Sequence, residues 1–260
     1  MLAELLELAP GGVEEDRAPE YVEFAIYGPP GELPEIPELQ AAAGAGTVEV
    51  DSTEIPDDWA DRWRDFHEPV VVGNRLRVQP SWLRPDGDAA DGLVEIVVDP
   101  GRAFGTGAHA TTRLCLELML ELEHPAGAFA DWGTGSGVLA IAAAKLGFDP
   151  VLACDHERSA VEAAAANAAA NGVELRVARV NLRHDPAPWA PTVTANMTTP
   201  VLRDIARLLA DDADRTPQTL IASGLLGSEI DDVAAAFAAS GLTERARRGD
   251  GDWHALVLSL

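Results

Sequence analysis

Short apolar segments alternate with longer amphipathic segments from residue 93 to the C-terminus, and this alternation most constrains the fold of the chain. The apolar segments predict strands, and the segments between them, with apolar residues at helical spacing, predict helices. Strands that alternate with helices build a mostly parallel sheet whose two faces are both covered. We therefore expect an α/β fold with a Rossmann-like, seven-stranded, mostly parallel sheet and helices on both faces. The expected strands are 93–98, 129–132, 151–155, 175–180, 193–196, 219–223 and 253–258, and the expected helices are 110–122, 137–146, 158–171, 200–210 and 228–239.

The first part of the chain has a different pattern and predicts a small α+β domain over residues 1–55. Such a unit is too small to bury much apolar surface alone. Its expected elements, around a proline-rich loop, are helices near 2–6 and 37–43 and strands near 21–27 and 47–55.

A linker over residues 56–80 joins this domain to the main domain, residues 81–260. The linker begins with a predicted helix that carries Trp59, Trp63 and Phe66 at helical spacing. This aromatic stripe is typical of packing, and we expect it to dock the linker onto the main domain. A hairpin around Gly73-Asn74 follows.

The chain carries a formal net charge of −24, which disfavours direct binding of nucleic acid because phosphates would be repelled. The charge favours a basic partner such as a lysine-rich protein. A second interpretation is a GC-rich or salt-adapted proteome, since Lys145 is the only lysine. Cys115 and Cys154 both lie in apolar runs, and we expect buried free thiols in a reducing cytoplasm.

A glycine-rich segment lies between the strand at 129–132 and the next helix, with the sequence Asp131-Trp132-Gly133-Thr134-Gly135-Ser136-Gly137. Glycines there allow a tight turn and let a ligand approach the main chain, and the helix N-terminus adds N–H donors. Dinucleotide-binding proteins use a related turn, but their spacing is G-x-G-x-x-G and the spacing here is G-x-G-x-G.

Asp155 ends the strand that follows this turn. A carboxylate at that position can accept hydrogen bonds from both hydroxyls of an adenosine ribose. The alternative is that Asp155 caps the helix that begins near Arg158. The turn and the acid together indicate a nucleoside-containing cofactor, and they leave NAD open.

A second glycine-rich loop lies upstream, from Asp99 to Thr112, with the sequence DPGRAFGTGAHATT. An oxidoreductase has no need of it. Taken with the turn at 133–137, Asp155 and the segment Asn196-Met-Thr-Thr-Pro200, it resembles the PrmA family, methyltransferases of the eleventh protein of the large ribosomal subunit. The resemblance extends to the linker, with Pro80-Ser-Trp82, and to the ending Trp253-His-Ala-Leu.

This resemblance implies a methyltransferase fold with a ferredoxin-like N-terminal domain, here abbreviated because the chain begins at the first helix of that unit. It implies S-adenosylmethionine as cofactor and N-methylation of lysine or N-terminal amines of a ribosomal protein. We expect a monomer without metal, membrane or nucleic-acid partners. Asn196 is the expected orienting residue for the amine, and the expected cofactor-binding residues are Thr112, Gly133, Gly135, Asp155, Asn196 and Phe104.

Several alternatives stay open at this point. His109 is either a base or a residue whose hydrogen bond fixes the upstream loop, and Thr112 is either a cofactor contact or an ordinary helix residue. Thr198 and Thr199 stand where the family usually has apolar residues, which could alter the acceptor pocket. A methyltransferase of another protein or a small molecule, an NAD-binding oxidoreductase and a non-catalytic cofactor-binding protein are the competing functions.

Overall fold

A computed structural model describes residues 14–17, 22–25, 68–83, 92–99, 107, 109–122 and 127–260. The chain divides into two compact units, Met1–Arg62 and Trp63–Leu260. In the first unit, β1 (Glu14–Arg17) pairs antiparallel with β2 (Val22–Ala25). β2 falls within the strand expected at 21–27, and β1 was not expected. The other elements expected in residues 1–55, and the linker helix with Trp59, Trp63 and Phe66, lie outside the described residues.

The second unit is built on a seven-stranded sheet in the order β11-β12-β10-β9-β6-β7-β8. The five strands from β10 to β8 are parallel to one another, whereas β12 runs antiparallel to both of its neighbours, β10 and β11. The sheet is therefore mostly parallel, as expected. Its strands are β6 (Phe129–Trp132), β7 (Val151–Asp155), β8 (Arg176–Arg179), β9 (Thr192–Asn196), β10 (Thr219–Leu226), β11 (Thr243–Asp250) and β12 (Trp253–Ser259).

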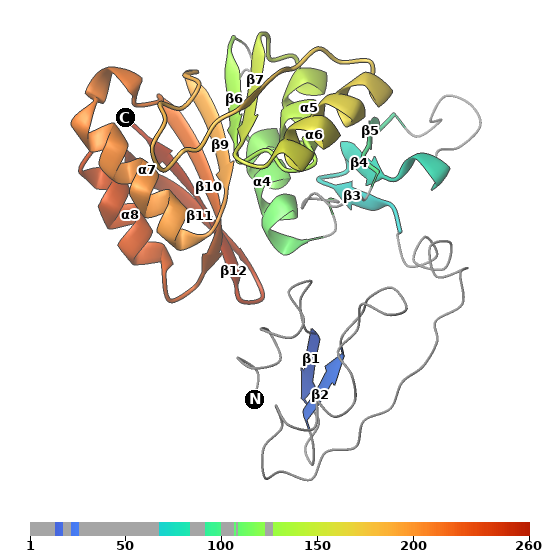
Figure 1. Ribbon diagram of the computed structural model, residues 1–260, viewed down its shortest axis with the longest axis horizontal. Helices are drawn as coiled ribbons and strands as arrows, with labels where there is room; N and C mark the ends of the chain where they lie inside the picture. The colour runs from blue at the N-terminus through green and yellow to red at the C-terminus, as the bar shows by residue number, and fades with distance from the viewer. Residues whose placement is uncertain are drawn as a thin grey trace. The chain divides into compact units, whose positions relative to one another are not determined.

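Helices cover both faces of this sheet (Figure 1). Those on one face share a core cluster with the sheet and those on the other face share a second cluster. The first face carries α4 (Ala110–Leu120), α5 (Val138–Leu146) and α6 (Arg158–Ala170), and the second carries α7 (Thr199–Asp211) and α8 (Ile230–Ala238). Single turns of 3-10 helix occur at Ser81–Leu83 and Ala213–Arg215. These five helices of the described residues fall where the sequence predicts them.

The membership of the sheet differs from the prediction in one strand. β5 (Val94–Val97) was expected to be its first strand, but it pairs in parallel with β4 (Leu76–Gln79) in a separate three-stranded sheet. The amide of Asn171, just after α6, bonds to both the N–H and the carbonyl of Val97, at 2.8 and 2.6 Å. The seventh strand of the main sheet is instead β11, whose residues are almost all exposed.

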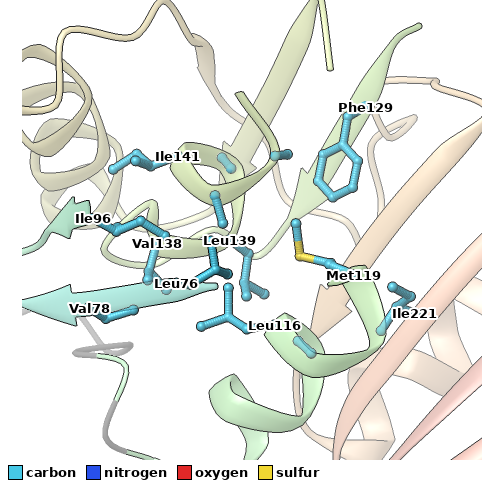
Figure 2. Packing of buried hydrophobic residues seen from close by; sticks show 14 of the residues in the cluster. Leu76, Val78, Ile96, Leu116, Met119, Phe129, Val138, Leu139, Ile141 and Ile221 are labelled. Atoms are coloured by element: carbon cyan, nitrogen blue, oxygen red, sulfur yellow. The ribbon is translucent and has the colours of Figure 1, made fainter. Parts of the chain in front are cut away.

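The small sheet belongs to the core of the second unit. β3 (Val70–Val72) and β4 form the expected hairpin, with Gly73 and Asn74 at positive φ. Although the sequence suggests a linker here, the inward residues of this sheet pack against α4 and α5. Figure 2 shows Leu76, Val78 and Ile96 beside Leu116 of α4 and Val138 of α5.

Cys115 and Cys154 are both buried and free, as the sequence predicts. Burial raises the pKa of the Cys154 thiol to about 12, and it also raises the pKa of the Cys115 thiol. Neither thiol is therefore a nucleophile at neutral pH. Over the described part of the chain, no helix combines the length and the apolar character that a membrane crossing requires.

Candidate functional site

The carboxyl ends of β6, β7, β9 and β10 meet at one edge of the main sheet. In register, Trp132 of β6 lies opposite Cys154 of β7 and Ala195 of β9, and Asn196 lies opposite Ser223 of β10. The chain moves from β6 toward β7 on one side and reaches β9 and β10 on the other side, so the strand order reverses beside β6. Ligands of open α/β sheets bind at such a reversal, outside the carboxyl ends of the strands.

The glycine-rich turn lies at this reversal and is tied to β7 by hydrogen bonds. The N–H groups of Gly133 and Thr134 both donate to the carbonyl of Cys154, at 2.9 Å. The N–H of Gly135 donates to Oδ2 of Asp155 at 3.0 Å. Gly133 has a φ of 71°, in the left-handed region that favours glycine. The turn and the acid predicted from sequence are therefore one connected structure.

Asp155 lies against the glycine turn and is not the N-cap residue of α6. The N-cap residue of α6 is Glu157. Oδ1 of Asp155 accepts the N–H of Glu157 at 3.0 Å, so the carboxylate bridges the glycine turn and the β7–α6 turn. A carboxylate has about four acceptor positions, and two backbone donors leave acceptor capacity for ribose hydroxyls.

Asn196 and Thr112 lie in contact although 84 residues separate them. The side-chain amide of Asn196 donates to the hydroxyl of Thr112 at 3.4 Å. Thr112 lies in the first turn of α4, buried at 1% exposure. Asn196 ends β9, next to β6 and its glycine turn. The structure therefore brings Thr112, Gly133, Gly135, Asp155 and Asn196 to one edge of the sheet.

Comparison with known protein families assigns this chain to a family. The sequence model described as "Ribosomal protein L11 methyltransferase (PrmA)" matches residues 34–260. The chain belongs to this family. Its fold is that of S-adenosylmethionine-dependent methyltransferases, and S-adenosylmethionine is the cofactor of the family.

Individual relatives agree with this assignment. A ribosomal protein L11 methyltransferase of Pelotomaculum thermopropionicum is 42% identical over 206 residues, 78% of this chain and 66% of that protein. One from Chloroflexus aurantiacus is 39% identical, over 77% of this chain and 68% of that protein. This chain thus spans about two thirds of the length of these relatives. The crystal structure of a ribosomal protein L11 methylase from Lactobacillus delbrueckii subsp. bulgaricus superposes with a TM-score of 0.63 at 30% identity, over 74% of this chain and 97% of that one.

The residues at the sheet edge fit the cofactor of this family. Backbone N–H groups of the turn and the first turn of α5 can hold a carboxylate, and the oxygens of Asp155 can accept ribose hydroxyls. A Cβ on Gly133 would lie 2.7 Å from a neighbouring side chain, so only glycine fits at this position of the turn without a shift. Phe104, the remaining predicted contact, lies outside the described residues.

His109 belongs to the frame of the site. It is the N-cap residue of α4, and its Nδ1 lies 2.8 Å from the hydroxyl of Thr111. Its ring packs edge-on against Trp253, with centroids 5.1 Å apart. The hydrogen bond of His109 thus lies at the start of the helix that carries Thr112, and most of the upstream loop that it was expected to fix lies outside the described residues.

Two buried residues of the site were not singled out from the sequence. Asp131, 1% exposed, accepts hydrogen bonds from the hydroxyls of Thr134 at 2.6 Å and Thr194 at 2.7 Å. It thereby connects the glycine turn to β9. Burial raises the pKa of Asp131 to about 6, although the two hydroxyls act in the opposite direction. The signal in the sequence is an acidic residue inside an otherwise apolar strand.

The second such residue is Asn167, in α6. Its amide donates to the carbonyl of Ser136 at 2.8 Å, and its Oδ1 accepts the N–H of Asp99 at 3.3 Å. It links the glycine turn to the beginning of the upstream glycine-rich segment. An asparagine inside an alanine-rich helix gave no hint of this role in sequence.

The two threonines after Asn196 lie at the start of α7. Thr198 is the N-cap residue, and the hydroxyl of Thr199 donates to Oε2 of Glu229 at 2.8 Å. Glu229 also accepts the N–H of Leu226, and these two bonds lower the pKa of its carboxyl. Thr199 therefore joins α7 to the β10–α8 turn.

The described surface includes two cavities in this half of the sheet. One of about 360 Å³ lies beside the end of β10 and the β11–β12 hairpin, with Asp252 and His254 in its wall. The other, about 270 Å³, lies between the segment 182–187 and the C-terminal half of α7.

Proposed function

We propose that the chain is a protein N-methyltransferase that modifies lysine or N-terminal amines of a large-subunit ribosomal protein. The observation that carries the proposal is the contact between Asn196 and Thr112 beside the turn that Asp155 closes. It joins the residue expected to orient the amine to the residues expected to hold the cofactor. Family membership and the names of the relatives supply the substrate class.

Positioning is the main demand of this reaction. When bound, S-adenosylmethionine supplies a methyl group already activated on a sulfonium sulfur, so the chain needs no group to activate it. The acceptor must present a neutral amine. A lysine of pKa about 10.4 is some three units from that state at pH 7, which costs about 4 kcal/mol. A desolvated acceptor site lowers that pKa and reduces the cost.

Asn196 is the residue proposed to orient the amine. An amide side chain offers an acceptor oxygen for an amine N–H, and it carries no charge that would favour the ammonium form. Thr112 fixes the other end of the same amide, so its plane is set before the acceptor arrives. The formal charge of −24 suits a basic protein substrate in the cytoplasm.

The test is methylation of ribosomal protein L11 prepared from a strain that lacks its methyltransferase. The purified chain, S-adenosylmethionine and this protein should yield added methyl groups by mass spectrometry, at lysine side chains or the N-terminus. Asn196→Ala should slow transfer at least about tenfold while S-adenosylhomocysteine still binds. Absence of added methyl groups, with S-adenosylhomocysteine bound normally, would reject the ribosomal substrate and favour another protein or a small molecule.

A further inference from the structure

Met197, the residue after Asn196, has its backbone held against β10. Its N–H donates to the carbonyl of Ser223 at 3.0 Å, which continues the β9–β10 pairing by one residue. The register of β10 against β12 shifts between Ser223 and Leu225, and Gly224 in the shift has a φ of 86°. A Cβ on Gly224 would lie 2.4 Å from the carbonyl oxygen of Met197 and 2.8 Å from its carbonyl carbon. Only glycine at position 224 leaves the Met197 peptide where it is.

The side chain of Met197 reaches the glycine-rich turn. A Cβ on Gly133 would lie 2.7 Å from Sδ and 2.8 Å from Cγ of Met197. The thioether thus lies directly over the α-carbon of the first glycine of the turn. A ligand that approaches the main chain at Gly133 therefore meets the end of the Met197 side chain.

Met197 is therefore connected to both parts of the proposed site. Its backbone continues from Asn196, the residue proposed to orient the acceptor, and its side chain touches the turn that holds the cofactor. Different atoms of Met197 lie close to the two glycines. The atoms near Gly224 belong to the Met197 backbone, and those near Gly133 belong to its flexible side chain. Methionine is unbranched and adapts its shape readily. The thioether can therefore adjust to a ligand while the peptide, and with it Asn196, stays in place.

We propose that Met197 forms one wall of the S-adenosylmethionine site, and that Gly224 is a positioning residue that fixes the Met197 peptide and thereby Asn196. The inference rests on the proposed function for its cofactor and acceptor. It adds Met197 to the site for cofactor binding and Gly224 for turnover. A binding measurement tests the first role, and a measurement of kcat tests the second.

The role of Met197 is tested by calorimetric titration with S-adenosylhomocysteine. Met197→Ala should weaken binding at least about fivefold, which corresponds to ~1 kcal/mol. Met197→Leu, of similar volume, should bind within about twofold of the wild type. Leu226→Ala, at the same edge and 40% exposed before truncation, is the matched control and should bind like the wild type. A smaller loss in Met197→Ala, or no recovery in Met197→Leu, overturns the assignment of the wall.

The role of Gly224 is tested against a glycine with the same backbone strain. Gly127 has a φ of 83°, and a Cβ there would meet nothing within 4 Å. Gly224→Ala should lower kcat at least about tenfold and leave the dissociation constant of S-adenosylhomocysteine within about threefold, whereas Gly127→Ala should change neither. Thermal unfolding of both variants reports the cost of the positive φ. Equal kcat in the two variants overturns the positioning role.

These outcomes also distinguish the inference from the proposed function. Binding of S-adenosylhomocysteine by Met197→Ala as strong as by the wild type rejects the wall alone. A wild-type chain that fails to bind S-adenosylhomocysteine rejects the proposed function and the inference together. If Gly224→Ala does not fold, the double variant Gly224→Ser/Met197→Ala gives a second test. Met197→Ala shortens the side chain at position 197 but leaves its peptide unchanged, so the double variant should also fail to fold. Recovery of folding there would overturn the peptide contact as the cause.

Discussion

The carboxylate of Asp155 holds the backbone of two turns and retains acceptor positions for a ligand. Its oxygens accept the N–H groups of Gly135 and Glu157, which fixes the direction in which the carboxylate points. Preorganised acceptors of this kind lose little freedom when a ligand binds. The ribose contact should therefore depend strongly on this one residue.

Asp155→Ala should weaken binding of S-adenosylhomocysteine at least about tenfold, because one charge-assisted hydrogen bond contributes about 1.5 kcal/mol or more. Asp155→Asn keeps one acceptor oxygen and should show a smaller loss. Asp212→Ala, on the surface near Arg215, is a control that should bind normally. Titration calorimetry measures all three, and binding within twofold of the wild type in Asp155→Ala would contradict the ribose contact.

Asp131 gives the stability of the chain a distinct dependence on pH. Its pKa is raised from 3.8 to about 6 in the folded chain, so between these values the folded chain binds more protons than the unfolded chain. The free energy of unfolding therefore falls as pH rises through this window and does not change further above it. Between pH 5 and pH 7 the loss from this one group is about 1 kcal/mol.

Asp131→Asn should remove this dependence, because an amide can bond both threonine hydroxyls without titrating. The wild-type chain should lose about 1 kcal/mol more stability than the variant between pH 5 and pH 7. Urea unfolding of both chains at several pH values gives the difference, in which other carboxylates cancel. Parallel curves for the two chains would show that Asp131 does not titrate in this range.

At the scale of elements, the start of α7 is tied to the β10–α8 turn by Thr199 and Glu229. Thr199 is 5% exposed, and its hydroxyl bonds a carboxylate that also accepts the N–H of Leu226. In a double-mutant cycle with Thr199→Val and Glu229→Ala, we expect a coupling free energy of about 1 kcal/mol. Additive losses in urea unfolding would mean that the bond contributes nothing to the junction.

The elements that the sequence predicts well are those whose pattern is local. The five helices carry apolar residues at helical spacing, and the buried strands β6, β7, β9 and β10 are short apolar runs. β11 was missed because its sequence, TERARRGD, has no apolar alternation, and an edge strand needs none. The prediction for β5 is wrong because its pairing with β4, and its hydrogen bonds to Asn171, depend on tertiary packing and not on local sequence.

The candidate site shows the same division. Gly133 and Asp155 follow from spacing, and Thr112 and Asn196 follow from family resemblance. The contact of Thr112 with Asn196, and the meeting of Gly133, Met197 and Gly224, join segments far apart in sequence, and no local pattern encodes them. The cofactor contacts of Thr112, Gly133, Asp155 and Asn196 stay predictions, as does that of Phe104 upstream.

At the scale of the whole molecule, the chain consists of two units, Met1–Arg62 and Trp63–Leu260, and all the site residues that the structure places belong to the second. Among the residues whose side chains the structure describes, the two core clusters of the second unit are built from residues from Val70 onward. We propose, from the resemblance, that the first unit recruits the protein substrate. Cofactor binding and substrate recruitment should therefore be separable by deletion.

Deletion of residues 1–62 should leave the dissociation constant of S-adenosylhomocysteine within about twofold, because no described site residue is removed. Methylation of ribosomal protein L11 should be abolished, because the remaining unit would have to find its acceptor without a recruiting surface. Cooperative thermal unfolding of the truncated chain is the control for folding. If the truncated chain methylates the ribosomal protein as fast as the full chain, the first unit has no recruiting role, and a different acceptor becomes the better proposal.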